Sequence, residues 1–384
     1  MNTCRRIYLP PLSLVGPNAL LELKDELAAR GFTKALFVTD EVLVKIGVAE
    51  KVEDVLKGAG LDYVTYSSVK QNPNTENVKE GLAILTENKC DCIITLGGGS
   101  PQDCGKAVGV LATNGGSIED YEGIHVSKKK SLPIIAINTT AGTASEITIN
   151  YVITDEKRKV KMVMVDKNCL VDIAVNDSML MLNKPASLTA ATGMDALTHA
   201  IEAYVTAGAF EWSDTLALKS IELIGSSLRD AVKDGQNIEA RTKMAWGQFI
   251  AGQAFSNCGL GYVHSMAHQL GGMYDLPHGV CNAILLPYVE EFNAEVCGEK
   301  LGKVAEALGA DTTGMSVDEK KKAAIDAIKK LSKDVGIPAG LKELNVDPKD
   351  FKAMAKNAMA DVCTGGNPRE VSLEETIKIY EAAY

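Results

Sequence analysis

The chain has 384 residues, of which 46% are apolar and 23% charged, a composition typical of a folded globular protein and not of a disordered one. This length predicts two or three domains. With 40 basic and 50 acidic residues, the net charge of −10 argues against a nucleic-acid or an anionic-membrane partner. No apolar run approaches the ~20 residues that span a bilayer, and Pro10, Pro11 and Pro17 interrupt the early apolar stretch, so we expect no membrane segment and no signal peptide.

Nine cysteines form an odd set without a Cys-x-x-Cys pair. In a chain of this size they predict reduced thiols, several of them in the core, and therefore a cytoplasmic protein. Of the five histidines, four lie between His199 and His278. This clustering indicates that imidazole chemistry is concentrated in the second half of the chain.

The first half alternates short β-branched runs with segments of helical spacing. We expect strands at 35–39, 63–67, 92–96, 134–138 and 173–175, and helices at 19–29, 42–58, 77–87 and 104–112. Alternation of this kind predicts βαβ units and a mostly parallel sheet covered on both faces. Two further strands, at 149–154 and 160–165, flank a polar turn at 155–158 and predict a hairpin.

From about Pro185 onward, strand signals nearly vanish. Segments with helical spacing lie at 186–206, 213–232, 240–256, 305–308 and 317–335. The sequence therefore predicts an α/β domain with a Rossmann-like parallel sheet over residues 1–185. An all-helical domain is predicted over residues 186–384.

A glycine-rich loop, Gly97-Gly98-Gly99-Ser100, follows the strand at 92–96, and Pro101 is expected to open a helix. Glycines let backbone N–H groups approach an anion, and a helix N-terminus adds a favourable dipole. The loop does not match G-x-G-x-x-G, because position 102 is Gln, and it is not a Walker A loop. A tight strand-to-helix turn without a ligand is therefore the alternative interpretation.

Two other polar segments follow predicted strands. Asp40 ends the strand at 35–39, where a carboxylate can bind an adenosine ribose and repel a 2′-phosphate, which favours NAD over NADP; a helix N-cap is the alternative role. The segment 139–143, Thr-Thr-Ala-Gly-Thr, follows the strand at 134–138 and offers hydroxyl groups and backbone donors. Because open α/β sheets bind ligands at the carboxyl ends of their strands, the three loops together predict a dinucleotide-binding domain.

One carboxylate and several imidazoles form a candidate metal site. Asp195 and His199 are four residues apart, as are His264 and His268, and residues at that spacing share one helix face; His278 follows at the expected start of another helix. Carboxylate and imidazole without thiolate suit Fe²⁺ or Zn²⁺ with room for a substrate. Surface ion pairs are the alternative, but the surroundings are small and apolar, where unpaired polar groups are costly. The spacing does not show which of these five residues is not a metal ligand. We expect His264 or His268 to be the one that is free to transfer protons.

These residues belong to longer motifs. The motifs are Gly97 to Asp103, Thr139 to Thr143, Ala191 to Glu202, and Gly261-x-x-His264-x-x-x-His268 through Pro277-His278-Gly279. They resemble the iron-containing (group III) alcohol dehydrogenases over essentially the whole chain. The likeness is greatest to the members that act on lactaldehyde and propane-1,2-diol, through 148–156, 255–257 and 361–370, and next to those that act on 1,3-propanediol, through 268–272. Asp177-Ser178 departs from the Asp-Pro of many members, and we expect it to relax a turn without affecting the chemistry.

The resemblance implies roles for particular residues. It implies Fe²⁺, with Zn²⁺ as an option, held by Asp195, His199, His264 and His278, and it leaves His268 as a catalytic non-ligand near the nicotinamide. It implies NAD contacts from a larger set: Asp40, Asn72, Gly97, Gly98, Gly99, Ser100, Asp103, Thr139, Thr140, Thr148 and Lys161. It also suggests a substrate pocket formed by Asn150, Phe255, Leu260 and Cys363, although a packed core thiol is an equal alternative for Cys363.

The predicted reaction is reversible hydride transfer between NADH and a short aldehyde, with the metal polarising the carbonyl oxygen. A proton would pass through His268 or through water and the ribose hydroxyls. The expected partners are a small aldehyde or alcohol and a second copy of the chain in a homodimer, with a decamer as the alternative.

Two other functions are alternatives to a dehydrogenase. A lyase similar to dehydroquinate synthase would need many basic residues for its phosphorylated substrate, and only Arg229, Lys233, Arg241 and Lys243 occur between positions 220 and 299. A metal-binding protein without catalysis would not need the predicted dinucleotide loop. Both are less favoured than the dehydrogenase.

Overall fold

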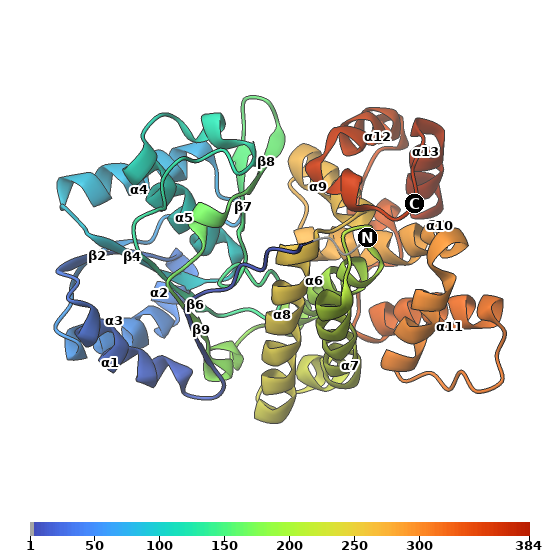
Figure 1. Ribbon diagram of the computed structural model, residues 1–384, viewed down its shortest axis with the longest axis horizontal. Coiled ribbons are helices and arrows are strands. Elements are labelled where there is room, and N and C mark those ends of the chain that lie inside the picture. Colours follow the sequence, from blue (N-terminus) through green and yellow to red (C-terminus); the bar gives the residue numbers. More distant parts are fainter. Residues whose placement is uncertain (1–3) are drawn as a thin grey trace. The chain divides into compact units, whose positions relative to one another are not determined.

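The computed structural model describes residues 4–384, and the chain divides into two compact units (Figure 1). The first unit consists of Met1–Thr140 and Ala144–Leu182, and the second of Ala141–Thr143 and Asn183–Tyr384. The domain boundary after residue 185 stays a prediction, because compactness alone does not show that a unit folds independently.

Six parallel strands form the main sheet of the first unit, in the order β1-β9-β6-β4-β2-β3. They are β1 (Leu12–Val15), β2 (Lys34–Val38), β3 (Asp62–Tyr66), β4 (Cys92–Gly97), β6 (Ile134–Asn138) and β9 (Ile173–Asn176). β4 pairs with β2 on one side and β6 on the other, so the carboxyl ends of these three strands meet at one edge. The predicted Rossmann-like parallel sheet is confirmed.

Helices cover both faces of this sheet, because successive side chains of a strand point to opposite faces. Leu36 and Val38 of β2 are buried with α4 (Thr75–Glu87) and α5 (Gly99–Asn114). Ala35 and Phe37 of the same strand are buried with α1 (Ala19–Arg30) and α3 (Val48–Gly58) on the other face. Burial on both sides explains why the inner strands, such as β4 and β6, are nearly continuous apolar runs.

A three-stranded sheet completes the first unit. β7 (Asn150–Asp155) and β8 (Val160–Val165) form the predicted antiparallel hairpin, and β5 (Gly123–Ile124) pairs in parallel with β8. At the turn, Oδ1 of Asp155 accepts hydrogen bonds from the N–H groups of Lys157 and Arg158 at 2.9 and 3.1 Å. Asp commonly stabilises turns in this way.

Several elements of the first unit differ from the sequence prediction. β1 and β5 were missed, because runs of four and two residues are too short to show a period. The helix expected at 42–58 is two helices, α2 (Glu41–Lys45) and α3, because Gly47 between them has a left-handed φ of 76°. α5 begins at Gly99, so Pro101 lies within the first turn, where its missing N–H costs no helical hydrogen bond.

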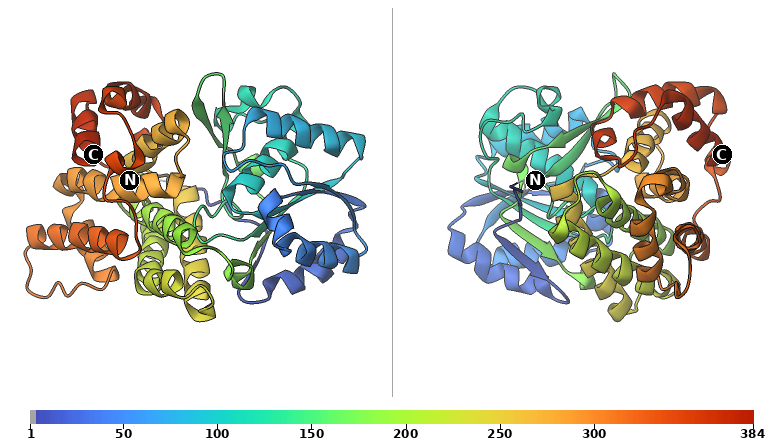
Figure 2. Two further views of the ribbon diagram at one scale, coloured as in Figure 1. Left: turned by 180° about the vertical axis from the view of Figure 1, so that it is seen from behind. Right: turned by 45° about the vertical axis from the view of Figure 1, so that its right-hand side comes forward.

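The second unit is helical, and this half of the predicted fold class is also confirmed. Its α-helices are α6 (Ala186–Val205), α7 (Glu211–Lys233), α8 (Ile238–Cys258), α9 (Tyr262–Tyr274), α10 (His278–Ala307), α11 (Val317–Asp334), α12 (Phe351–Ala360) and α13 (Leu373–Ala382). α7 and α8 lie side by side, and both contact α6 (Figure 2). The sequence patterns did not predict α12 and α13.

α6 is the central helix of the second unit. It contacts α7, α8 and α10, and almost every residue from Thr189 to Val205 is buried. A helix that is buried on all sides brings its polar residues into the interior, and on α6 these include Asp195, His199 and Glu202.

None of the helices within residues 4–384 combines the length and the apolarity needed to cross a membrane. All nine cysteines are free thiols.

Candidate active site

The glycine-rich loop joins the carboxyl end of β4 to α5 in the first unit. Gly97 has a φ of 147°, and a Cβ at this position would lie 2.6 Å from Cγ of Pro101. A Cβ on Gly98 would lie 2.9 Å from the Thr140 side chain. Gly98 is the N-cap of α5, and no side chain among the described residues caps this end. The first-turn N–H groups therefore form a cradle that fits a pyrophosphate.

Thr139 and Thr140, directly after β6, lie beside this loop. The N–H of Thr139 donates to the carbonyl oxygen of Gly97 at 3.1 Å, and the N–H of Thr140 donates to Oδ1 of Asn138 at 2.9 Å. Two of the three predicted loops are thus brought together, because β4 and β6 are neighbours in the sheet.

Asp40 lies at the end of the adjacent strand, β2. Its Oδ1 accepts a hydrogen bond from the N–H of Leu43 at 2.9 Å, so Asp40 is the N-cap of α2, the alternative role considered from the sequence. The cap uses one carboxylate oxygen.

Asp103 has a structural part in the first unit. Its carboxylate accepts hydrogen bonds from the Ser145 hydroxyl at 2.7 Å and from the N–H of Val152 at 3.0 Å, which ties α5 to β7. Burial raises the pKa of this carboxyl group. Two other predicted cofactor residues, Asn72 and Lys161, bind each other, with Nζ of Lys161 2.6 Å from Oδ1 of Asn72.

The start of β7 is fixed by Lys106, a wholly buried ammonium group that the sequence did not single out. Its Nζ donates to the carbonyl oxygens of Thr148 at 2.9 Å and Asn150 at 2.8 Å, and burial lowers its pKa. Oδ1 of Asn150 is buried without a hydrogen-bond partner among residues 4–384. A polar atom left in that state is one that a ligand can satisfy.

Four predicted metal ligands come together in the second unit. Asp195 and His199 lie one turn apart on α6, and His264 comes from α9; the ligand atoms of these three residues lie within 4.8 Å of one another. His278 is the first residue of α10, and its Nε2 lies 3.7 Å from Oδ1 of Asp195. Three helices therefore supply one group of donors.

Burial sets the protonation of this group. Asp195, His199 and His264 are 2%, 4% and 2% exposed. Burial lowers the pKa of both His199 and His264, so each is a neutral imidazole at neutral pH, and burial raises the pKa of Asp195. Nδ1 of His199 is buried without a hydrogen-bond partner among the described residues. A carboxylate, neutral imidazoles and an orphaned ring nitrogen, with no thiolate in the group, fit Fe²⁺ or Zn²⁺.

His268 lies outside this group, and the structure favours it over His264 as the spare histidine. Its Nδ1 is 2.8 Å from Oδ2 of Asp361, whose Oδ1 accepts the N–H of Cys363 at 2.9 Å. Its ring stacks on His278, with the centroids 5.5 Å apart. A carboxylate at Nδ1 orients the ring and leaves Nε2 for proton transfer.

The predicted substrate residues of the second unit have different surroundings. Phe255 stacks on His199, with ring centroids 4.3 Å apart, and so packs against the donor group. Cys363 is half-buried beside His268 and Asp361, and burial raises the pKa of its thiol well above its usual value, so it is not a thiolate. Leu260 is buried, and its carbonyl oxygen accepts a hydrogen bond from the Thr206 hydroxyl at 3.2 Å.

Two residues with no predicted role touch the donor group. Glu202 on α6 pairs with Nδ1 of His264, and its other oxygen accepts the N–H of Val263 at 2.8 Å. Nδ2 of Asn282 lies 2.7 Å from Oδ1 of Asp195. Helical spacing gives a partial signal for both, because Glu202 is seven residues after Asp195 and Asn282 is four after His278, so each shares a helix face with a proposed ligand.

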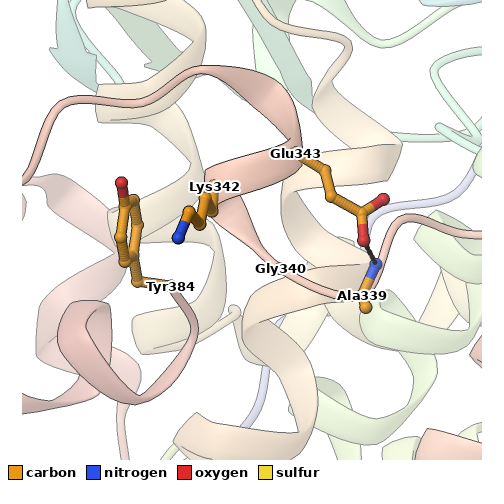
Figure 3. Close-up of a pocket in the computed structure, with 5 residues that line it drawn as sticks. All are labelled: Ala339, Gly340, Lys342, Glu343 and Tyr384. Atoms are coloured by element: carbon orange, nitrogen blue, oxygen red, sulfur yellow. Dashed lines mark hydrogen bonds between the residues drawn. The ribbon is translucent and has the colours of Figure 1, made fainter.

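A surface depression of about 450 Å³ lies elsewhere in the second unit, beside the carboxyl end of the chain (Figure 3). Its lining residues are Ala339, Gly340, Lys342, Glu343 and Tyr384. Oε1 of Glu343 accepts the N–H of Ala339 at 3.3 Å. None of the predicted site residues lines this depression.

Comparisons with known proteins cover both units. A model described as iron-containing alcohol dehydrogenase matches residues 10–178, and one described as Fe-containing alcohol dehydrogenase family, C-terminal, matches residues 189–384. The lactaldehyde reductase of Escherichia coli (strain K12) is 46% identical over 381 residues, which cover 99% of each chain. The 1,3-propanediol dehydrogenase of Citrobacter freundii is 46% identical over 378 residues, which cover 98% of each.

Solved structures of alcohol and aldehyde oxidoreductases are also similar to this chain over nearly its whole length. A crystal structure of 1,3-propanediol oxidoreductase is 44% identical with a TM-score of 0.97 and matches 100% of both chains. Sulfoacetaldehyde reductase from Bifidobacterium kashiwanohense, in complex with NAD⁺, is 29% identical with a TM-score of 0.88 and matches 100% of this chain and 99% of its own.

Proposed function

Because the chain belongs to the iron-containing alcohol dehydrogenase family, and is therefore an oxidoreductase of alcohols and aldehydes, we propose that it interconverts lactaldehyde and propane-1,2-diol with NAD(H). The observation that carries the proposal is the convergence of Asp195, His199 and His264 on one buried point, with His278 beside them. The 46% identity with a lactaldehyde reductase supports this choice of substrate.

The proposed metal is Fe²⁺, with Zn²⁺ as the alternative, and the proposed ligands are Asp195, His199, His264 and His278. A bound dication supplies a Lewis acid that polarises a carbonyl oxygen. The residues around it keep the site dry, since Phe255 covers one face of His199. His268, oriented by Asp361, is the proposed proton carrier, because its Nε2 is not used by that hydrogen bond.

The proposed dinucleotide site is the edge of the first unit where β2, β4 and β6 end. The glycine-rich loop from Gly97 to Ser100 would hold the pyrophosphate, and Asp40 the adenosine ribose. The remaining proposed contacts are Asn72, Asp103, Thr139, Thr140, Thr148 and Lys161. The proposed substrate pocket comprises Asn150, Phe255, Leu260 and Cys363, and Oδ1 of Asn150 supports it as a buried acceptor without a partner among residues 4–384.

A substrate panel tests this function. The protein would be prepared without oxygen, its metal content measured, and NADH or NADPH consumption followed with lactaldehyde, 3-hydroxypropionaldehyde and simple aldehydes. We expect NADH with lactaldehyde to give the highest kcat/KM. Full activity of metal-stripped protein, or a His264→Ala variant that still binds one ion per chain and turns over, would contradict the proposal.

The second candidate is the oxidation of 1,3-propanediol. It is favoured by the 46% identity with the 1,3-propanediol dehydrogenase of Citrobacter freundii and by the TM-score of 0.97 with a 1,3-propanediol oxidoreductase. A higher kcat/KM for 3-hydroxypropionaldehyde than for lactaldehyde would favour this second function over the first.

We also propose that the chain forms a homodimer, with a decamer as the alternative, and that it acts in the cytoplasm. Light scattering coupled to size-exclusion chromatography distinguishes the two assemblies by mass. Fractionation of the source cells tests the compartment.

A further inference from the structure

β7 is the last strand of the three-stranded sheet, so the backbone groups along its outer side have no strand of that sheet beside them. Two side chains of α5, a helix that contacts β7, bond to backbone groups of this region (Figure 1). Asp103 accepts the N–H of Val152 at 3.0 Å. Lys106, about one turn further along α5, donates through Nζ to the carbonyl oxygen of Asn150 at 2.8 Å. α5 therefore takes the part of the missing neighbour at the start of β7.

The donors of Lys106 are all used within residues 148–150. An ammonium group carries three donors. Besides its bond to Asn150, Nζ donates to the carbonyl oxygen of Thr148 at 2.9 Å and faces Oγ1 of the same residue at 3.4 Å. The side chain is wholly buried. Lys106 therefore has no donor left for a phosphate group, and its effect on a ligand must pass through the segment that it holds.

The charge of Lys106 is costly to bury, because its hydrogen-bond partners are uncharged oxygen atoms. Asp103 and Glu146 offset part of this cost by attraction over a longer distance. An apolar side chain in place of a buried charge is often neutral or stabilising. Overall stability is therefore a weak reason for a lysine at this position, and the placement of residues 148–150 is a stronger one.

Residues 148–150 carry two of the proposed ligand contacts, Thr148 for the dinucleotide and Asn150 for the substrate. Oδ1 of Asn150 is buried without a hydrogen-bond partner among residues 4–384, so this acceptor depends on the backbone for its position. α5 begins at Gly99 in the proposed pyrophosphate cradle, and Lys106 follows about two turns later. One helix therefore fixes the cradle and, through Lys106, the segment that carries these two side chains.

We propose that Lys106 is a positioning residue, which holds the backbone of residues 148–150 so that Thr148 meets the dinucleotide and Asn150 the substrate. The inference rests on the proposed function, which supplies both ligands. Because the donors of Lys106 are all used by the protein, it takes no part in hydride or proton transfer. Its loss should weaken binding more than it slows turnover.

The affinity for NADH tests this role. NADH would be titrated by fluorescence into the full-length protein and into Lys106→Met, which keeps the length of the side chain and removes its donors. We expect the dissociation constant to rise at least about tenfold in the variant. With lactaldehyde, KM should rise by a similar factor while kcat falls by less than about threefold. Lys106→Gln keeps an amide donor, so its loss of affinity should be smaller, and it serves if the methionine variant does not fold.

The matched control is Val110→Ala. Val110 is wholly buried about one turn after Lys106 on the same helix and packs in the apolar core of the first unit. The substitution leaves a cavity and should lower the stability of this unit. It should change the dissociation constant for NADH by less than about twofold, since the contacts of Lys106 with residues 148–150 remain.

Hydrogen exchange separates positioning from packing. The backbone amides of residues 145–152 would be compared by mass spectrometry with those of β2, in protein without NADH. We expect exchange in residues 145–152 to be at least about tenfold faster in Lys106→Met, because local opening of the segment becomes easier, and exchange in β2 to stay unchanged. Val110→Ala should not speed exchange in residues 145–152 selectively.

The parent protein and the variants distinguish two kinds of failure. If the parent binds neither NADH nor NADPH, the proposed dinucleotide function is wrong, and the role of Lys106 falls with it. If the parent binds NADH and Lys106→Met binds it equally well, or if residues 145–152 exchange no faster in that variant, the dinucleotide function stands and the role of Lys106 is overturned. Equal losses of affinity in Lys106→Met and Val110→Ala would also overturn it, in favour of simple packing.

Discussion

The helical unit contains buried polar side chains that have few hydrogen-bond partners. Glu290 on α10 is fully buried, and neither carboxyl oxygen has a hydrogen-bond partner among residues 4–384. Burial raises its pKa from 4.5 to about 8. It also raises the pKa of the nearby Glu202, the partner of His264. Glu290 also acts electrostatically on Glu202, so a second buried carboxyl group lies near the partner of His264.

Glu290→Gln should reduce the pH dependence of stability. The folded protein keeps a proton on Glu290 up to about pH 8, whereas the unfolded chain loses it near pH 4.5. Stability is therefore fully present below pH 4.5 and falls as the pH rises toward 8, by roughly 1.4 kcal/mol per pH unit at most. Urea unfolding at pH 5 and pH 8 should show a smaller loss in the variant, and an equal loss would contradict the assignment.

Asp40→Asn should raise the use of NADPH relative to NADH. The substitution removes the charge that would repel a 2′-phosphate, while Asn remains a good N-cap for α2. We expect the NADPH/NADH ratio of kcat/KM to rise by at least about tenfold, which is roughly 1.4 kcal/mol of discrimination. Glu41→Gln removes a charge one residue further on and should leave the ratio unchanged; an equal effect of both variants would indicate a general charge effect.

At the scale of elements, the connection between β4 and α5 carries the proposed pyrophosphate contacts. The strand is fully buried, so its end is fixed, and the helix begins two residues later without a side-chain cap. Gly97 makes the turn possible through its φ of 147°. The loop therefore makes the tight turn between strand and helix, and it also supplies the N–H groups that would donate to a phosphate.

Gly97→Ala should weaken NADH binding. A Cβ would lie 2.6 Å from Pro101 and would strain the backbone, so the loop must move. We expect the dissociation constant for NADH, measured by fluorescence titration, to rise at least about tenfold. Gly115→Ala, at the other end of α5, has a φ of 76° and open space for a Cβ, so it should cost stability but leave NADH affinity intact. If both variants lost NADH affinity to the same extent, the substitutions would act through a general effect on α5.

At the scale of the whole molecule, the two compact units have different chemistry. The first is built on a parallel sheet and carries the proposed dinucleotide residues, and the second is helical and carries the proposed metal ligands. In the second unit the ligands come from α6, α9 and α10, so an ion held by all three helices would cross-link them. Metal binding should therefore act mainly on the stability of the second unit.

Metal removal should lower the melting temperature of the second unit. Both tryptophans of the chain, Trp212 on α7 and Trp246 on α8, lie in this unit and report on its unfolding. At an ion concentration 100 times the dissociation constant, we expect stabilisation of about 2.7 kcal/mol. His264→Ala is the control and should melt at the same temperature with and without Fe²⁺; a parent protein that shows no shift would contradict a metal bound by three helices.

The sequence by itself determined the fold class and the positions of most strands and helices, and it supplied the residues proposed for the site apart from Lys106, Glu202 and Asn282. These features depend on local spacing: alternation predicts strands, and a four-residue interval places Asp195 and His199 on one helix face. Spacing failed where the local signal was weak, as for β1, or where one residue interrupted a pattern, as Gly47 does between α2 and α3.

Residue spacing left open which of His264 and His268 lies in the donor group, and only the tertiary structure showed that Glu202 and Asn282 touch it. His264 and Glu202 are 62 residues apart, and Asn282 and Asp195 are 87 apart. Contacts at such separations depend on how helices pack and rotate against one another, which no local period encodes. The sequence therefore names most of the residues proposed for the site, and the packing of α6, α9 and α10 sets which atoms of those residues meet.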